Sequence, residues 1–560
     1  MDDPRKVREF EAVVRSERSG LSRRQFLRRG LALGLSLPAA SGVIASVLGP
    51  PVYAMPKPGL RRAQKGGQGT LVVGQNGDPK SFNPDNQIDD FNFQFAFNIF
   101  STLVCLSQTY DVIPDLAKSW EVSEDGKQIT FLLNEGVSWH DGEPVTAADV
   151  KWTYEKIVAT EGAPGRDNLS ALDHIETPDD YTAVFVLKNP SSPFLGFLAW
   201  YGTFVLPKHI YDGTDWMTNE ANQNPVGCGP FKFVEYVAGD HVTLEANLDY
   251  FGEGPYMDRV VTRIIPDPAT MEQALLNEEV DADPWGSLSF DSIPNFEADG
   301  RFTVIRKEFP SVYYLTFNFN REITGNVKVR QAIGMAIDRA VIIERGLAGF
   351  GNPVNTYYTP VIAWANNPDA TAPEYDPEAA KALLDEAGYP VGDDGYRFKL
   401  VFPYFSATDQ WRNIAQVVQA QLRDIGIDVE LAEMEIAAWE QRLREQDDFD
   451  LSLLDGFFGP GPGNLKNRYG TGGGINLWHY SNAEVDRLLD EAAQSADQAA
   501  ATEMYHQIQA LLAQDIASIP LSSWVGSIVY RKELSGFPVP GDPVGEILGF
   551  YNYARVQRTA

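Results

Sequence analysis

The stretch IPDLAKSWEVSEDGKQITFLLNEGVSWHDGEPVTAADVKWTYEKI, residues Ile113 to Ile157, contains the signals of a strand, a turn and a helix in that order. QITFLL at 128–133 has the composition of a β-strand, and HDGEP at 140–144 combines an Asp-Gly pair with a proline, as turns do. Thr146 and Asp149 then have the spacing of a capping box, ahead of an apolar helical stripe. This succession predicts a mixed α/β fold.

The turn in this stretch also brings His140, Asp141 and Glu143 close together, a composition that suits metal ligands or an acid/base pair. A metal site needs three or four converging ligands, and a hydrolase needs a nucleophile beside a positioned base. The sequence around the turn shows neither arrangement. We therefore interpret the cluster as a structural turn that leads into the helix.

The composition of the whole chain indicates a well-packed globular protein. Of its 560 residues 44% are hydrophobic and 12% aromatic, and this length suggests about two to four domains. The formal net charge of −31 repels phosphate backbones, so we expect no nucleic-acid partner. No GxxxxGK[ST] loop, GxSxG elbow or HExxH pattern occurs, and we therefore expect neither an enzyme nor a cofactor or metal.

The N-terminus has the features of an export signal. SRRQFLRRG at 22–30 places paired arginines before an apolar run at 31–48, and VYA at 52–54 offers a cleavage site. Residues 1–54 are thus predicted to be a signal peptide of the twin-arginine type, with an uncleaved anchor helix as the alternative. Residues 55–69, rich in Pro, Gly and basic residues, are predicted to be a flexible linker. We expect a periplasmic or other extracytoplasmic location.

The chain has two cysteines, Cys105 and Cys228. An oxidising compartment would permit a disulfide between them, but sequence spacing does not show whether their Cα atoms are close enough. Buried free thiols are the alternative. No CxxC or HxxxH pattern accompanies them, so they do not indicate a zinc site.

The remainder of the chain alternates strand and helix signals. Residues 326–347 have apolar residues at helical spacing, and YDPEAAKALLDEAGY has Asp376 as N-cap and Gly388 as the helix stop. Ser481 and Glu484 have the spacing of a capping box. The strand candidates are TLVVGQ (70–75), QITFLL (128–133), YTAVFVL (181–187), HVTLEAN (241–247), YYLTFNFN (313–320), FKLVFPYF (398–405), IDVELAEM (427–434) and FDLSLLDGFF (449–458).

The opening stretch is also the first block of a longer pattern, which continues in the same order with NPVGCGPFKFVEYVAGDHVTLEANLDYFG, NEEVDADP, FNFNREITGNVKVRQAIGMAIDRAVIIERGLAGFGNPV, YDPEAAKALLDEAGY, FDLSLLDGFF and NLWHYSNAEVDRLLDEA. This series closely resembles the family 5 extracellular solute-binding proteins, the dipeptide-, oligopeptide- and nickel-binding components of ABC importers. Cys228 stands where that family usually has Thr. The likeness runs from about Thr70 to Tyr553, and this many blocks in one order is specific.

The resemblance implies an α/β clamshell of the periplasmic binding protein type II kind, in which two lobes close over a ligand. By analogy, lobe one is expected at 70–100, 198–309 and 519–560, its extra subdomain at 101–197, and lobe two at 310–518. The HDGEP turn then lies in the subdomain, away from the cleft.

The implied function is that of the substrate-binding component of an ABC importer, which captures a short peptide and delivers it to the permease subunits in the membrane. A monomer suits this delivery. An oligosaccharide or another small polar solute is the alternative ligand within the same family. A twin-arginine-exported enzyme is a further alternative, and a ligand-sensing partner of a membrane receptor is another.

The resemblance also indicates which residues contact the ligand. Asp455, Gly456, Phe457 and Phe458 end a strand of lobe two, where peptide-binding members pair an Asp with the ligand's α-amino group. Asp455 is the nearest acidic residue, although it lies earlier than the family Asp. Dipeptide binders place an Arg after the FKLVFPYF-type strand to hold the carboxylate, and here Tyr404 stands nearby.

The remaining predicted contacts are Asn83 in the first loop and the aromatic side chains of Trp285 and Trp524. Together with Phe457, Phe458 and Tyr404, the two tryptophans suit stacking on sugar rings as well as packing in the core. His479 is the single histidine candidate near this side of lobe two, and a lone histidine is more often structural.

Overall fold

The computed structural model describes residues 65–87, 90–405, 409–539, 546–547 and 550–559. The predicted signal peptide and most of the predicted linker lie outside these residues. Within them, no helix combines the length and the apolar composition that crossing a bilayer requires.

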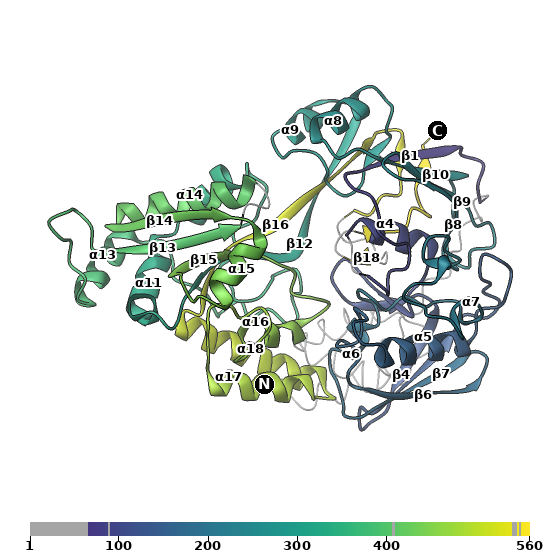
Figure 1. The fold of residues 1–560 in the computed structure, drawn as a ribbon, viewed down its shortest axis with the longest axis horizontal. Coiled ribbons are helices and arrows are strands. Elements are labelled where there is room, and N and C mark those ends of the chain that lie inside the picture. The colour runs from purple at the N-terminus through teal and green to yellow at the C-terminus, as the bar shows by residue number, and fades with distance from the viewer. Residues whose placement is uncertain (1–64, 88–89, 406–408, 540–545, 548–549, 560) are drawn as a thin grey trace, which may run out of the picture. The chain divides into compact units, whose positions relative to one another are not determined.

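The largest element is an eight-stranded mixed sheet with strand order β15-β12-β16-β11-β1-β10-β9-β8 (Figure 1). β1 pairs in parallel with β10 and β11, and the other neighbours are antiparallel. The bounds are β1 (Thr70–Gln75), β8 (Phe231–Val237), β9 (His241–Ala246), β10 (Arg259–Ile264), β11 (Ala282–Asp283), β12 (Phe302–Phe317), β15 (Leu451–Leu454) and β16 (Ser518–Arg531).

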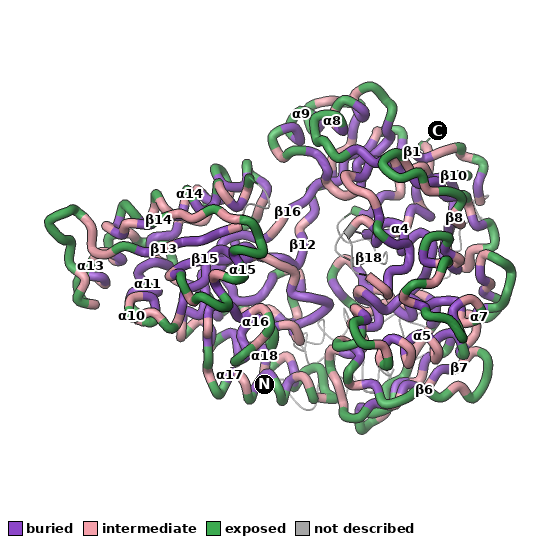
Figure 2. Tube along the Cα trace, viewed as in Figure 1, coloured by how far each residue is buried: buried purple, intermediate pink, exposed green. Residues whose placement is uncertain are grey.

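Two strands of this sheet, β12 and β16, are much longer than their neighbours and pair along nearly their whole length. One end of the ladder pairs with β11, and the other end of β12 pairs with β15. The register shifts between Glu308 and Val312, opposite Val525 and Ser523, so the ladder is irregular at its middle. Figure 2 shows both strands as largely buried. The two strands thus connect β1, β10 and β11 with the part of the chain around β15.

A separate antiparallel sheet has the order β4-β5-β7-β6, and α5 (Ala147–Ala159) packs on β6. Asp149 Oδ2 accepts bonds from the Thr146 N–H at 2.8 Å and from its hydroxyl at 3.1 Å, which confirms the predicted capping box. The four strands are β4 (Ala117–Val122), β5 (Gln128–Leu133), β6 (Leu172–Asp179) and β7 (Thr182–Leu187).

A second α/β layer packs next to β15, at the end of the β12–β16 ladder. β13 (Phe398–Phe405) and β14 (Ile427–Met434) are parallel, and α14 (Asp409–Asp424) lies between them in the chain. The remaining long helices are α4 (Asp90–Ile99), α8 (Pro268–Leu276), α11 (Val327–Ala336), α13 (Pro377–Glu386), α15 (Ile436–Arg444), α17 (Ala483–Ala493) and α18 (Gln498–Asp515).

Short elements complete the described chain: β2 (Val104–Leu106), β3 (Val112–Pro114), α6 (Phe194–Phe197), α7 (Lys208–Tyr211), η1 (Glu220–Asn222), α9 (Ile293–Ala298), α10 (Glu322–Gly325), α12 (Arg339–Val341), η2 (Ile342–Gly346), η3 (Pro462–Asn464), α16 (Leu465–Tyr469), β17 (Leu534–Ser535), β18 (Glu546–Ile547), β19 (Phe550–Tyr551) and β20 (Gln557–Arg558).

Two local predictions are wrong. The single helix expected over 326–347 breaks at Ile337, whose ψ is 107°, because Asp338 caps the start of α12 with its side chain. The capping box of Ser481 and Glu484 is also absent: the N-cap of α17 is Asn482, whose side chain accepts from the N–H groups of Glu484 and Val485. By contrast, Asp376 and Gly388 cap α13 as predicted, with the glycine at φ +89°.

The last residues of the predicted linker are held against the fold. Gly66 N–H donates to the Pro255 carbonyl at 2.8 Å, and the N–H groups of Gly67 and Gly69 donate to the Asp258 carboxylate at 2.5 and 2.9 Å. These three glycines therefore belong to the ordered fold rather than to a flexible segment.

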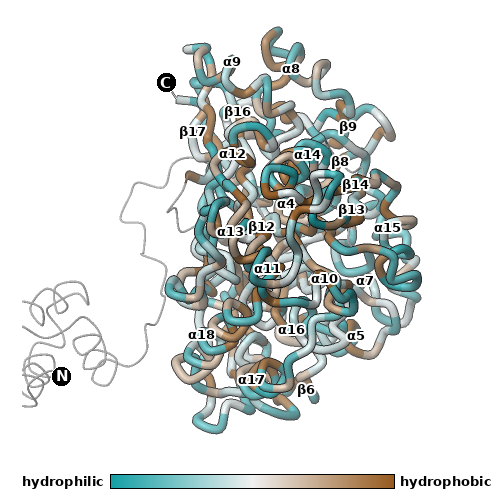
Figure 3. Tube along the Cα trace, turned by 90° about the vertical axis from the view of Figure 1, so that its left-hand side faces the viewer, coloured by the Kyte–Doolittle hydropathy of each residue, from teal (hydrophilic) through white to brown (hydrophobic). Residues whose placement is uncertain are grey.

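The buried hydrophobic residues form three clusters. One of them combines β13, β14 and the apolar faces of α11 and α14 with residues of β12 and β15. Hydropathy changes along single elements such as α14 in Figure 3, as amphipathic helices require. The fold is thus mixed α/β, as predicted. The boundaries proposed for two lobes and a subdomain stay a prediction.

Candidate functional site

The candidate site lies where β15 ends against the irregular middle of the β12–β16 ladder. Beyond β15, Phe457 forms an isolated bridge with Ser311, and the Phe458 N–H donates to the Pro310 carbonyl at 2.9 Å. Gly456, between the end of β15 and Phe457, turns the chain with φ +134°, a conformation that L-residues rarely adopt. The loop after β15 is thereby fixed beside the ladder.

Three aromatic rings meet at this point, and we call Phe309, Phe457 and Trp524 the aromatic trio. Phe309 stacks on Trp524 with centroids 4.7 Å apart, and Phe457 meets Trp524 edge-on at 5.6 Å. Phe309 is 6% exposed, whereas Phe457 and Trp524 are half-buried and present apolar surface. Such rings can stack on or pack against a ligand.

Asp455 supplies the negative charge next to the trio. Its side chain is half-buried, and burial raises the pKa of its carboxyl to about 7. No basic side chain of the described residues lies within ion-pair distance of it. Tyr313 has a pKa raised mainly by burial and further by the Asp455 charge, so the carboxyl lies near Tyr313 of β12. An uncompensated carboxylate of this kind favours a cationic partner.

Lys307 supplies a positive charge at the other end of the trio. It is 6% exposed, and its Nζ lies 5.7 Å from the centre of the Phe309 ring. Its cross-strand partner is Gly526, and a Cβ there would lie 2.8 Å from Phe309 Cε2. The glycine therefore leaves the room that the Phe309 ring occupies beside Lys307.

The sequence interpretation missed Lys307, Phe309 and Tyr313 as site residues. Its strand began only at 313, so the first half of β12 was not recognised. A signal was present: FTVIRKEFPSVYYLTF at 302–317 places a lysine in a segment of strand-forming residues, and in a buried strand such a charge needs a reason.

Two predicted contacts, Tyr404 in β13 and Phe458 after β15, belong to the core. Phe458 is 2% exposed, with its ring 4.8 Å from that of Tyr358. Tyr404 is 3% exposed, and its hydroxyl donates to Glu433 Oε2 at 3.3 Å. Arg412 binds the same carboxylate at the surface, so the hydroxyl of the buried Tyr404 side chain has an internal partner.

The two predicted contacts outside this region are also occupied by internal partners. Asn83 is fully buried; its Nδ2 donates to Asn222 Oδ1 at 2.9 Å, and its Oδ1 accepts from the Asp85 N–H at 2.9 Å. Trp285 stacks on Phe550 at 4.8 Å and is not joined to the aromatic trio. Neither residue lies with Asp455 in the candidate site.

The HDGEP cluster is a turn, as predicted. His140 Nδ1 accepts from the Gly227 N–H at 3.3 Å, and Nε2 lies 3.0 Å from the Gly229 carbonyl, to which it donates. Burial lowers the pKa of His140 to about 4, so the imidazole is neutral at pH 7. Asp141 Oδ2 lies 2.8 Å from His209 Nε2. The His140 and Asp141 side chains thus both have internal partners.

The remaining titratable candidates do not form a metal or redox centre in the described part of the chain. His479 Nε2 lies 3.1 Å from Asp447 Oδ1, and no group of three His, Cys, Asp or Glu side chains is arranged for a metal among these residues. Cys105 and Cys228 are free thiols, and burial raises the pKa of both.

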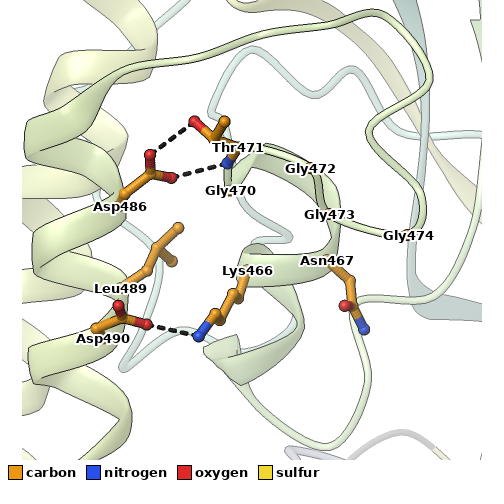
Figure 4. Close-up of a pocket in the computed structure, with 10 residues that line it drawn as sticks. All are labelled: Lys466, Asn467, Gly470, Thr471, Gly472, Gly473, Gly474, Asp486, Leu489 and Asp490. Atoms are coloured by element: carbon orange, nitrogen blue, oxygen red, sulfur yellow. Dashed lines mark hydrogen bonds and ion pairs between the residues drawn. The ribbon is translucent and has the colours of Figure 1, made fainter.

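A polar hollow of about 290 Å³ lies elsewhere, between α16 and α17 beside a glycine-rich loop (Figure 4). Its charged groups are already paired. Lys466 Nζ lies 2.5 Å from Asp490 Oδ1, and Thr471 donates to both oxygens of Asp486, at 2.8 and 2.6 Å. These bonds close the loop onto α17, which explains the hollow structurally.

The chain is similar to known binding proteins over most of its length. It is 30% identical over 507 residues to the oligopeptide-binding protein AppA of Bacillus subtilis, covering 87% of this chain and 90% of that protein. The ABC transporter substrate-binding protein CtaP of Listeria monocytogenes has a similar structure, with a TM-score of 0.79, 27% identity and coverage of 89% and 100% of the two chains. The structure of the Bacillus subtilis AppA in complex with a nonapeptide gives a TM-score of 0.70, 28% identity and coverage of 89% and 100%.

Residues 111–475 match the model of the bacterial extracellular solute-binding proteins, family 5. This range contains the strand, turn and helix of the opening stretch as well as the end of β15. Such proteins bind a solute and carry out no reaction on it. The chain belongs to family 5 of the bacterial extracellular solute-binding proteins and is the substrate-binding component of an ABC transporter.

Proposed function

We propose that this protein captures a short peptide between two closing lobes and that Asp455 binds the ligand's α-ammonium group. The observation that carries the proposal is the half-buried Asp455 carboxyl, which burial destabilises in its charged form and which has no basic partner among the described residues. A peptide ammonium would supply the missing charge. Two comparisons support the same ligand class. The relative in Bacillus subtilis is named an oligopeptide-binding protein, and a structure of that protein contains a nonapeptide.

The physical argument is that an ion pair at the terminus recognises what all peptides share. Charge-assisted bonds of this type contribute about 1.5–3 kcal/mol each. The aromatic trio beside Asp455 would then pack against side chains of varied shape without demanding one of them.

The cellular setting is part of the proposal. A twin-arginine-type signal at 1–54 would export the protein to the periplasm or another extracytoplasmic space. The lobes at 70–100, 198–309, 519–560 and 310–518 would close on the ligand, with β12 and β16 as the connecting strands. The closed monomer would then deliver the peptide to the permease subunits.

The direct test is native mass spectrometry of the purified protein, followed by identification of any small molecule that it carries. A family of peptide masses is the expected result. A single sugar or chelate mass instead would retire the peptide proposal. Small-angle scattering should also show contraction when the identified ligand is added, and an unchanged radius with bound ligand would contradict closure.

An oligosaccharide is the second candidate ligand, because Phe457 and Trp524 present half-buried rings that suit stacking on a sugar face. Replacing Trp524 by Leu distinguishes a sugar ligand from a peptide ligand. A sugar ligand should lose most of its affinity with the ring, whereas a peptide held by Asp455 should lose much less.

A further inference from the structure

Arg468, on α16, is a buried cation beneath the loop that follows β15. It is 1% exposed, and its Nη2 donates to the Phe457 carbonyl at 3.2 Å. Its Nε and Nη1 are buried and have no hydrogen-bond partner in the described part of the chain, and no carboxylate there lies within ion-pair distance. Two of its three guanidinium nitrogens are therefore unsatisfied by the fold.

Arg330, on α11, shows how this chain stabilises a buried arginine that is purely structural. It is 4% exposed, and its Nε donates to the carbonyls of Asp515 and Ile516 at 3.2 and 3.1 Å. Its Nη1 donates to Thr324 and Gly325 at 2.9 and 2.7 Å, and its Nη2 to Asp515 at 2.7 Å. All three nitrogens of Arg330 are bonded, in contrast to those of Arg468.

The surroundings of Arg468 are rings whose polar atoms are donors. The guanidinium lies 5.1 Å from the Tyr314 ring and 4.5 Å from the Phe458 ring. Tyr358 packs on Phe458 at 4.8 Å, and Trp478 on Tyr314 at 6.0 Å. The hydroxyls of both tyrosines and the indole N–H are likewise buried without a hydrogen-bond partner.

This composition selects for an anion. Burial lowers the pKa of Arg468 to about 10, which still leaves the side chain charged at pH 7. Removing a guanidinium from water is costly, and the ring faces at 5.1 and 4.5 Å offset only part of that cost. A planar oxyanion matches the two parallel N–H directions of a guanidinium and accepts from hydroxyl and indole donors.

We propose that Arg468, with the donors of Tyr314, Tyr358 and Trp478, forms an oxyanion site of the carboxylate class beneath the loop after β15. The bond from Arg468 to Phe457 connects the site with the aromatic trio. The anion comes either from a carboxylate group of the transported ligand, which rests on the proposed function, or from a free carboxylate ion in solution, which does not.

The first experiment measures thermal unfolding of the ligand-stripped protein in sodium acetate and in sodium chloride at equal ionic strength. We expect a saturable rise in Tm that is larger in acetate than in chloride. Arg468→Met should abolish this difference. Arg468→Lys, which keeps the positive charge but loses the two parallel N–H donors of the guanidinium, should reduce it. Arg330→Lys is the matched control and should lower Tm while leaving the acetate effect intact.

The second experiment separates the two sources of the carboxylate. The peptide identified by mass spectrometry is compared with its C-terminal amide by calorimetry. A preference of about tenfold or more for the free acid, lost in Arg468→Met, assigns the site to the ligand. Equal binding of acid and amide, together with the acetate effect, assigns it to a free anion.

The proposal is overturned if acetate and chloride act equally on the wild-type protein and the acid and amide bind equally. It is also overturned if Arg330→Lys removes the acetate effect as fully as Arg468→Lys does. Should Arg468→Met fail to fold, the wild-type measurements and Arg468→Lys still decide. Absence of any co-purified peptide would count against the proposed function alone, because the acetate measurement needs no peptide.

Discussion

The HDGEP turn and the loop after β15 both place an acidic group beside aromatic or imidazole rings, yet they differ in how their polar groups are satisfied. In the turn, His140 and Asp141 each have an internal partner, and the imidazole is neutral. In the loop, Asp455 has a pKa raised to about 7 by burial. The first region resembles a reactive site in sequence and is scaffold. The comparison indicates that a buried charge without a partner, rather than the type of residue, distinguishes the candidate site from the turn.

The reason lies in where the partners come from. The partners of His140 are backbone groups of residues 227 and 229, and these reach the turn only through the folded sheet. Asp455 lies near Tyr313 of β12, which is even farther away in the sequence, and no basic side chain of the described residues reaches its carboxyl. Both outcomes depend on long-range packing.

The sharpest test of this comparison is Asp455→Asn, which keeps the shape of the side chain and removes the charge. We expect the co-purified peptide to bind about 1.5–3 kcal/mol more weakly, roughly 10- to 150-fold, as measured by calorimetry. Asp450→Asn is the control, since the Asp450 carboxylate already accepts a hydrogen bond from the Val401 N–H of β13 at 2.7 Å. Equal losses in both variants would show that Asp455 acts on stability and not on the ligand.

The pH dependence of peptide affinity sharpens the same comparison. The bound ammonium requires ionised Asp455, so affinity should be highest above pH 7 and fall about tenfold per pH unit below the pKa of about 7. Binding at pH 6 should release a proton, which calorimetry in buffers of different ionisation enthalpy detects. Asp455→Asn should show neither effect. A wild-type affinity that is flat between pH 5 and 8 contradicts the assignment.

Asp455 should also make the stability of the ligand-free protein depend on pH, but in the opposite direction to the affinity: stability should fall as pH rises. The pKa of Asp455 is higher in the folded than in the unfolded chain, so the folded state binds more protons between about pH 4 and 7. Its contribution to stability is therefore present at low pH and lost as pH rises through 7. Asp455→Asn should remove this loss in urea-unfolding measurements on the ligand-free protein.

His140→Gln tests the scaffold half of the comparison. The folded pKa of His140, about 4, lies below its ordinary value of 6.5, so the unfolded chain binds more protons and stability falls as pH drops from 6.5 to 4. We expect this decrease to be about 1–2 kcal/mol after allowance for partial solvent screening, and to be absent in the variant. His209→Gln should keep it. Unchanged peptide affinity in His140→Gln would complete the contrast with Asp455.

The smallest expected effect is that of Thr146→Ala in the helix cap next to the turn. The Thr146 hydroxyl binds the Asp149 carboxylate, and its N–H binds the same oxygen. Because the alanine variant keeps the N–H bond, we expect a loss of only about 0.5–1 kcal/mol in the free energy of unfolding, with no change in affinity. A change in affinity would place this helix in the binding region after all.

The sequence alone identified the mixed α/β class, the family and most of the elements. Strands such as 70–75, 398–405 and 427–434 have the predicted bounds, because their patterns of apolar and β-branched residues are local. Two local signals misled: Asn482 caps α17 in place of Ser481, and Asp338 divides the helix expected over 326–347. At α17 two adjacent capping residues competed, and at 338 an internal Asp starts a new helix within a continuous apolar pattern; propensity reveals neither outcome.

Only the tertiary structure decided which predicted residues stand together. Asp455, Phe457 and Trp524 meet because β15 and β16 both pair with β12, whereas Asn83 and Trp285 are engaged elsewhere. The unsatisfied nitrogens of Arg468, compared with the five bonds of Arg330, have no counterpart in the sequence pattern. Periodicity and capping depend on neighbours in the chain, and the sequence shows them. Desolvation and the absence of a partner depend on atoms that approach from far along the chain, and only the folded molecule brings those together.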